Sequence, residues 1–229
     1  MTFVLSLLST ADWAALTLFL AGWFGYGWFA DRAARSERGL RGVTSQLRLD
    51  WARQMVARDN RITDAALTGN LMTSVSFYAN TTIYIIAGLI AVAGTLDQLM
   101  TFTKDLPFAK QTTKTLLEGK LFLMIAIFVF AYFKFTWALR QYNFLSILIG
   151  GAPPPEGAPA LLEAHAQKFA RLSTLAGDEF NRGIRAYYFG FAALGWFAAP
   201  ALFGAATLLI LAVLWRRDFH SATLATLAK

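Results

Sequence analysis

The segment LMTSVSFYANTTIYIIAGLIAVA, residues 71–93, contains no charged side chain. A helix of ~20 apolar residues crosses the ~30 Å hydrocarbon core of a bilayer, so this segment predicts a membrane span. Three further apolar runs lie at residues 13–30, 121–139 and 187–215. We therefore predict an all-α integral membrane four-helix bundle, with residues 1–229 forming a single transmembrane domain.

The composition excludes several kinds of site. The chain has no cysteine, which excludes disulfides and thiolate metal ligands. Its two histidines, His165 and His220, lie outside the apolar runs, and we expect neither a metal nor another cofactor. The net charge is +7. Because basic and acidic residues are interleaved, we expect contact with anionic lipid headgroups and no binding of nucleic acid.

The distribution of lysine and arginine predicts an orientation. The first and third loops together carry thirteen such residues, and the opposite side of the predicted bundle carries seven. Cytoplasmic loops are enriched in these residues, so we predict a multi-pass protein of the cytoplasmic (inner or plasma) membrane, with loops one and three in the cytoplasm and both termini outside. Residues 1–10 have no lysine or arginine, so we expect no cleaved signal, and we expect the first helix to be capped by Thr10 or Asp12.

Two segments outside the spans have apolar residues at helical spacing. They predict amphipathic cytoplasmic helices at about residues 43–68 and 160–182. Gly69 is a possible break before the second span, and the proline-rich residues 150–159 end the third helical region. Pro200 lies inside the fourth span, where we expect it to produce a kink.

The second span has one polar face, and two interpretations of it remain open. Its side chains either bond neighbouring helices or line a hydrated path. At 100° per residue, the face carries these candidates for pore lining or helix packing: Asn70, Thr73, Ser74, Asn80, Thr81 and Tyr84.

Charged residues near the predicted cytoplasmic ends of the spans also allow two interpretations. Lys134 lies within the third span, where a charge is costly unless its stem reaches the headgroups. These side chains form either a lattice of ion pairs or an electrostatic vestibule for anions. Helical spacing predicts pairs of Asp64 with Arg61 and Asp178 with Arg182. The candidates at this inner mouth are Arg58, Arg61, Asp64, Lys134, Arg140, Arg182 and Arg185.

We find no catalytic motif in the sequence. It has no nucleophile elbow, no phosphate-binding glycine loop and no zinc motif, so we name no catalytic residue and expect no enzyme activity.

Several segments, taken in order, carry a resemblance to a protein family. They are residues 58–64, 70–74, 77–82, 137–143 and 180–189. Together they resemble an uncharacterised family of polytopic membrane proteins, the domain of unknown function 599. The resemblance implies an all-helical membrane protein and implies no known activity.

Two functions remain open at this point. The first is an oligomeric channel or transport subunit that conducts ions or small solutes, with the polar face of the second span along the path. The second is a non-catalytic accessory or scaffold subunit of a larger membrane complex, in which the same residues hold helices together. Both imply a homo-oligomer or a subunit of a membrane complex.

Overall fold

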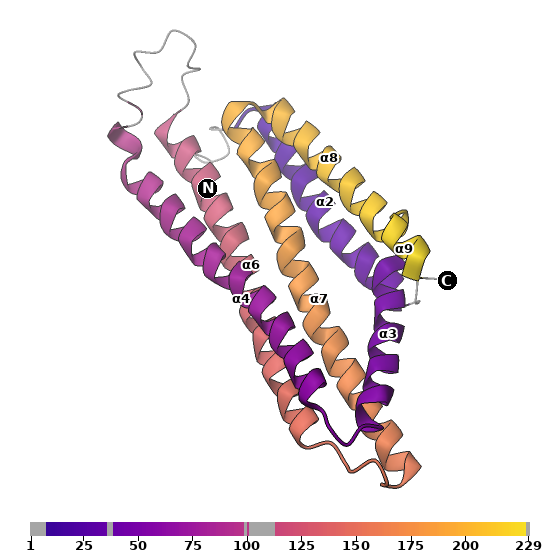
Figure 1. Cartoon of the computed structure of the whole chain (residues 1–229). Helices are drawn as coiled ribbons and strands as arrows, with labels where there is room; N and C mark the ends of the chain where they lie inside the picture. Colours follow the sequence, from indigo (N-terminus) through magenta and orange to yellow (C-terminus); the bar gives the residue numbers. More distant parts are fainter. Residues whose placement is uncertain (1–7, 36–38, 99, 101–112, 228–229) are drawn as a thin grey trace.

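The computed structural model describes residues 8–35, 39–98, 100 and 113–227, and the regular elements within these ranges are all helices (Figure 1). The helices are α2 (Thr10–Arg35), α3 (Gly39–Val56), α4 (Ile62–Gly94), α6 (Lys114–Gly150), α7 (Pro159–Ala198), α8 (Pro200–Phe219) and α9 (Ala222–Leu227).

Helix α7 is the central element of the fold (Figure 1). Its 40 residues extend for about 60 Å, and it contacts α6, α3, α8 and α2. At one end, α2, α8 and parts of α4, α6 and α7 form an apolar section. At the other end, α3 and the remaining parts of α4, α6 and α7 form a second section, which we call the extension (residues 39–80 and 138–181).

The predicted fourth span, residues 187–215, is not one helix. Helix α7 ends at Ala198, Ala199 is extended with φ −162° and ψ 149°, and Pro200 begins α8 at a position where proline is favoured. The chain reverses there, and Trp196 stacks on Phe203 across the turn with ring centroids 5.1 Å apart. Pro200 therefore starts a returning helix, where we had expected a kink in a continuous one.

Helices α2 and α8 lie side by side and run in the same direction (Figure 1). Phe19 contacts Phe203 near their starts, and the Tyr26 hydroxyl donates a 2.7 Å hydrogen bond to Asp218 near their ends. The beginning of α2 and the end of α8 therefore lie at opposite ends of the apolar section. This arrangement does not fit the predicted topology, in which four crossings leave both termini on one side.

The helices predicted at residues 43–68 and 160–182 also differ from the prediction in their bounds. The chain leaves helical geometry between Val56 and Ile62, and Gly69 lies inside the continuous helix α4. The segment 160–182 is the first part of α7, which continues without a break to Ala198. The predicted end of α6 in the proline-rich segment is confirmed, because α6 ends at Gly150 and α7 begins at Pro159.

The N-terminal cap of α2 is a reciprocal pair of hydrogen bonds between Ser9 and Asp12. Ser9 lies one residue before Thr10, the first of the two predicted cap residues, and Asp12 is the second. The backbone N–H of Asp12 donates to Ser9 Oγ at 3.1 Å, and the backbone N–H of Ser9 donates to Asp12 Oδ2 at 3.1 Å. This is a capping box, and it satisfies two N–H groups at the start of the helix.

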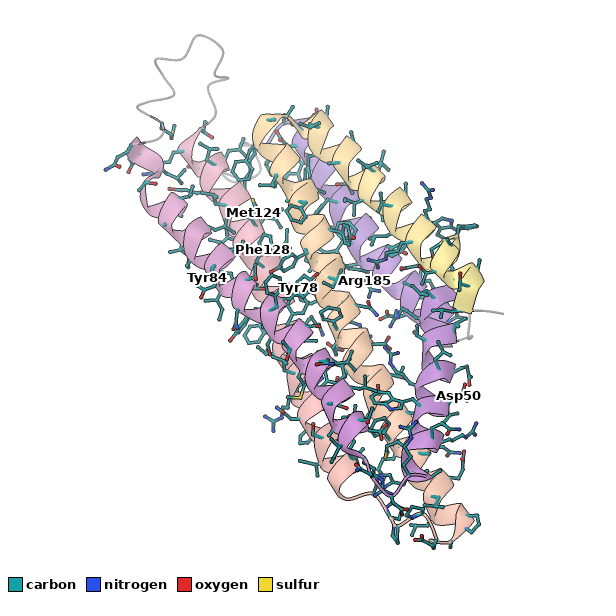
Figure 2. The ribbon with its side chains drawn as sticks, in the orientation of Figure 1. Asp50, Tyr78, Tyr84, Met124, Phe128 and Arg185 are labelled. Atoms are coloured by element: carbon teal, nitrogen blue, oxygen red, sulfur yellow. The ribbon has the colours of Figure 1, made fainter. Side chains whose placement is uncertain are left out.

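Aromatic rings fill the centre of the bundle where α4, α6 and α7 meet. Tyr78 of α4 packs against Phe135 of α6 and Tyr187 of α7, with centroids 5.6 Å and 6.0 Å away. Figure 2 shows Tyr78 and Phe128 directed into this interior. Gly183 and Gly190 of α7 leave the space that the rings of Phe135 and Phe128 occupy, so close approach of α6 to α7 depends on these glycines.

Among the described residues, three segments are long and apolar enough to cross a membrane, judged by length and composition. They are Ile62–Gly94, Lys114–Gly150 and Pro200–Leu227. These segments include the predicted spans at 71–93 and 121–139 and the second part of the predicted fourth span. They support a membrane protein.

We predict that Gly183→Ala destabilises the fold. The added methyl group would overlap the ring of Phe135, which is fully buried, and overpacking of this kind costs about 1–3 kcal/mol. Gly69→Ala is the matched control, because nothing lies within 4 Å of its added carbon and alanine favours a helix by ~0.5–1 kcal/mol. Thermal unfolding in detergent should show a lower midpoint for the first variant and an equal or higher one for the second. Equal midpoints for Gly183→Ala and the wild type would contradict the packing described here.

Candidate functional site

A cluster of charged side chains lies where the apolar section meets the extension. We call it the inner cluster, and it is supplied by α2, α3, α6 and α7. Its members are Asp31, Arg41, Lys134, Asp178, Glu179, Arg182 and Arg185.

Asp31 is the centre of the inner cluster. Its carboxylate accepts from Arg41 Nη1 at 2.6 Å, from Arg182 Nη2 at 2.7 Å and from Arg185 Nη2 at 3.2 Å. Burial alone would raise the pKa of Asp31, but the hydrogen bonds from Arg41 and Arg182 outweigh it and lower this pKa to about 2. One carboxylate from α2 thus holds guanidinium groups from α3 and α7.

The other two acids of the cluster complete its pairing. Asp178 Oδ1 lies 2.6 Å from Arg41 Nη2, and Glu179 Oε2 lies 2.8 Å from Lys134 Nζ. Arg182 also pairs with Glu179. The ion pairs therefore connect α6 to α7 and α7 to α2, and they connect α3 to both α2 and α7. Charged groups that are buried in this way need partners, because removing them from water is costly.

A second, smaller cluster lies at the opposite end of the apolar section. Trp196 Nε1 donates to Asp12 Oδ1 at 2.7 Å, and Lys120 Nζ donates to the Trp196 carbonyl oxygen at 2.7 Å. All three side chains are buried. Along α6, the fourteen residues from Lys120 to Lys134 separate the two clusters by about 21 Å.

The structure divides the predicted inner-mouth residues among three places. Lys134, Arg182 and Arg185 belong to the inner cluster. Arg140 is exposed on α6, with its guanidinium 5.7 Å from the Phe144 ring. Arg58, Arg61 and Asp64 lie at the far end of the extension. The predicted set is therefore not a single mouth.

The residues at the far end of the extension connect its helices. Asp64 is fully buried and accepts from Trp51 Nε1 at 2.7 Å and from Arg58 Nη1 at 2.9 Å. Arg61 donates to the carbonyl of Met55 at 3.2 Å and to that of Pro153 at 2.6 Å. Arg61 thereby binds the end of α3 to the α6–α7 loop. These contacts give Arg58, Arg61 and Asp64 a structural role, because they connect the helices at this end of the extension.

The predicted polar face of α4 points away from the rest of the chain. Asn70, Thr73, Ser74, Asn80 and Tyr84 are exposed, and Thr81 is half-buried. Figure 2 shows Tyr84 directed outward from the bundle, and 76% of its surface is accessible. The hydroxyls of Thr73, Ser74 and Thr81 donate to carbonyls one turn earlier in α4. Within the described protomer, these residues neither bond other helices nor line an internal path.

The pairings expected from helical spacing differ from those observed. Asp64 binds Arg58 rather than Arg61, and Asp178 binds Arg41 rather than Arg182. Sequence reasoning also missed Asp31 and Arg41 as members of a site. One signal was available for Asp31, because it is the acid that directly follows the first apolar run and precedes a loop rich in arginine.

The described residues include no candidate metal centre. No group of three or more His, Asp or Glu side chains in this part of the chain is placed to hold a metal ion. A shallow groove of about 280 Å³ lies between α3 and α7, lined in part by Ser45, Gln167 and Thr174. The groove does not include any residue of the inner cluster.

The chain belongs to the family described as "Protein of unknown function, DUF599", whose model matches residues 14–223. No curated protein and no solved structure matches it. The family assignment confirms the resemblance found in the sequence and adds no activity.

We predict that Asp31→Asn weakens the joint between the two sections. The substitution removes the anion that Arg41, Arg182 and Arg185 share. The network is partly buried, so we expect a cost of about 1–3 kcal/mol, between that of an exposed and that of a fully buried ion pair. Glu163→Gln, which removes the exposed partner of Arg53, is the control and should change stability little. Chemical unfolding in detergent measures both. Equal effects of the two substitutions would contradict the central role of Asp31.

The lowered pKa of Asp31 also predicts a pH dependence. Its folded-state pKa of about 2 lies below the ordinary 3.8, so its contribution is present above pH about 4 and is lost as the pH falls towards about 2. The difference in unfolding free energy between wild type and Asp31→Asn should therefore be constant above pH 4 and shrink below it. A difference that stays constant down to pH about 2 would show that Asp31 is not held in this way.

Proposed function

We propose that the protein is a non-conducting membrane scaffold that holds a rigid helical extension at the cytoplasmic surface. The observation that carries the proposal is the inner cluster, which closes one end of the apolar section with ion pairs from four helices. In this proposal the apolar section lies in the bilayer, the extension lies in the cytoplasm, and no solute passes through the protomer.

The dimensions of the apolar section support this placement. The apolar part of α2, residues 13–30, is about 27 Å long, and Pro200–Trp215 of α8 is about 24 Å long, close to the ~30 Å of a hydrocarbon core. Exposed tryptophans lie near the inner cluster, at Trp28, Trp137 and Trp215. The Arg32 guanidinium lies 5.7 Å from the Trp28 ring. Aromatic and basic residues of this kind favour the headgroup region.

The reversal at Ala199 gives five crossings, with the N-terminal side outside and the C-terminal side in the cytoplasm. This topology fits the basic residues better than the four-crossing one. With Arg216, Arg217 and Lys229 on the cytoplasmic side, sixteen lysine and arginine residues lie in the cytoplasm and four lie outside. In the four-crossing topology these numbers are thirteen and seven. The arginine pair after Trp215 lies outside in the four-crossing topology, where it opposes the predicted orientation. In the five-crossing topology the pair lies in the cytoplasm and supports the orientation.

The position of the polar residues on α4 argues against conduction. Tyr78 of α4 packs against Phe135 of α6 and Phe180 of α7, the neighbours of Lys134 and Glu179, so Tyr78 lies level with the inner cluster. Asn70, Thr73 and Ser74 then lie in the cytoplasmic extension. From Ile85 to Gly94, α4 has no polar side chain over about 14 Å. A pore lined by this stretch would exclude water.

The alternative of a conducting oligomer makes a different prediction for the same helix. If copies of α4 surround a pore, small residues in its second half, such as Ala91, must contact water. In the scaffold they face lipid or a protein neighbour. The cysteine-free chain allows this difference to be measured.

We predict that Ala91→Cys resists a membrane-impermeant maleimide, whereas Ser74→Cys reacts with it from the cytoplasmic side. Both positions are exposed on α4, but only Ser74 lies in the extension. Purified protein in liposomes should add no ion leak above that of empty liposomes. Labelling of Ala91→Cys together with a leak would overturn the scaffold and favour the channel. An unreactive Ser74→Cys would overturn the cytoplasmic placement of the extension.

A further inference from the structure

The outer face of α4 carries a row of residues whose side-chain hydrogen bonds and ring contacts in the described part of the chain are all within α4 itself. Its members lie at spacings of three and four residues, which keep them on one face of the helix, as in the seam of a coiled coil. Every one of them is exposed. They are Asn70, Thr73, Phe77, Asn80, Tyr84 and Ala87, and Ala91 continues the spacing.

This seam has no charge. No acidic or basic residue occurs between Ala65 and Leu96, although α4 extends through the whole length of the extension and the apolar section. At the same level, α3 and α7 present charged side chains to solvent, including Asp50 and Arg53 (Figure 2 shows Asp50 directed outward). The chain has a net charge of +7, so the uncharged seam is a face on which identical copies do not repel each other.

Two asparagines lie on the seam within the extension (residues 39–80). Within the described part of the chain, neither Asn70 nor Asn80 makes a side-chain hydrogen bond, whereas Thr73 bonds its own helix. Phe77, 66% exposed, lies between them. A carboxamide both donates and accepts, so it is complementary to a second copy of itself. Asparagine in a helix seam fixes the register of a pair and hydrogen-bonds across it.

We infer that the seam of α4 binds a second copy of this chain, in a parallel pair related by a twofold axis along the membrane normal. Copies in one membrane share an orientation, so Asn70, Phe77 and Asn80 each meet the same residue of the partner. In the apolar section, the small residues Ala87 and Ala91 allow the two helices to approach closely. The inference deepens the proposed scaffold by naming its first partner, and it rests on the membrane placement given above.

The area of the seam favours a helix of a second copy over a globular partner. From Asn70 to Ala91 it is about 32 Å long and about 10 Å wide, which gives on the order of 600–700 Å² for both sides. Stable interfaces between soluble proteins need about 1,200 Å² or more. Anchoring in one membrane raises the effective concentration of the two helices, so a smaller contact suffices.

Disulfide cross-linking in native membranes tests this inference. We expect Thr73→Cys and Asn80→Cys to give a dimer after mild oxidation, because each lies on the seam axis. Leu71→Cys is the control at the same level of α4, 38% exposed but turned away from the seam, and should remain monomeric. In a separate measurement, Asn70→Ala with Asn80→Ala in an otherwise unchanged chain should reduce the dimer at least fivefold by native mass spectrometry.

The outcomes separate the inference from the proposed function. Monomers from both seam variants, or equal cross-linking of Leu71→Cys, would overturn the seam, and so would a dimer mass that survives the double asparagine substitution unchanged. The scaffold is tested independently by ion leak, because Ala91 itself lies on the seam. Cross-linking on the seam together with a leak would support the pair and overturn the scaffold.

Discussion

The cost of burying charge in a largely apolar chain determines where the two sections of this protein meet. Asp31 lies at the end of the apolar part of α2 and accepts from Arg41, Arg182 and Arg185, which come from two other helices. A carboxylate and guanidinium groups that are removed from water must be paired with each other, because an unpaired buried charge is costly. Their meeting fixes α2 against α7 and sets the position of α3, so the bundle changes there from five apolar segments to a four-helix extension.

Features set by local composition were predictable from the sequence, and contacts between residues distant in sequence were not. The apolar runs at 71–93 and 121–139 and the proline-rich stop at 150–159 follow from local composition, and each lies where it was expected. Pro200 is compatible with a kink or with a reversal. The choice depends on Phe203 packing against Trp196 and Phe19, which sequence patterns do not reveal.

The candidate site shows the same division. Lys134, Arg182 and Arg185 were identified because charge near an apolar run is conspicuous. Their partners are distant in sequence, since Asp31 lies 151 residues from Arg182 and 154 from Arg185, and Glu179 lies 45 residues from Lys134. Helical spacing favoured Asp178 with Arg182, and the long-range pair of Asp178 with Arg41 replaced it. The polar face of α4 was recognised by its periodicity, yet periodicity alone gives no direction. In the structure the polar face of α4 is directed outward, so its residues are available for a contact between two protomers rather than for a path within one.

The reversal at Ala199 puts the start of α2 and the end of α8 at opposite ends of the apolar section, and in the proposed placement these ends lie on opposite sides of the membrane. The most direct test is the sidedness of two single cysteines, Ser9→Cys before α2 and Ser221→Cys after α8. An impermeant thiol reagent should label the first from outside the cell and the second only in inverted vesicles. Labelling of both from outside would restore the four-crossing topology and contradict the structure of the apolar section described here.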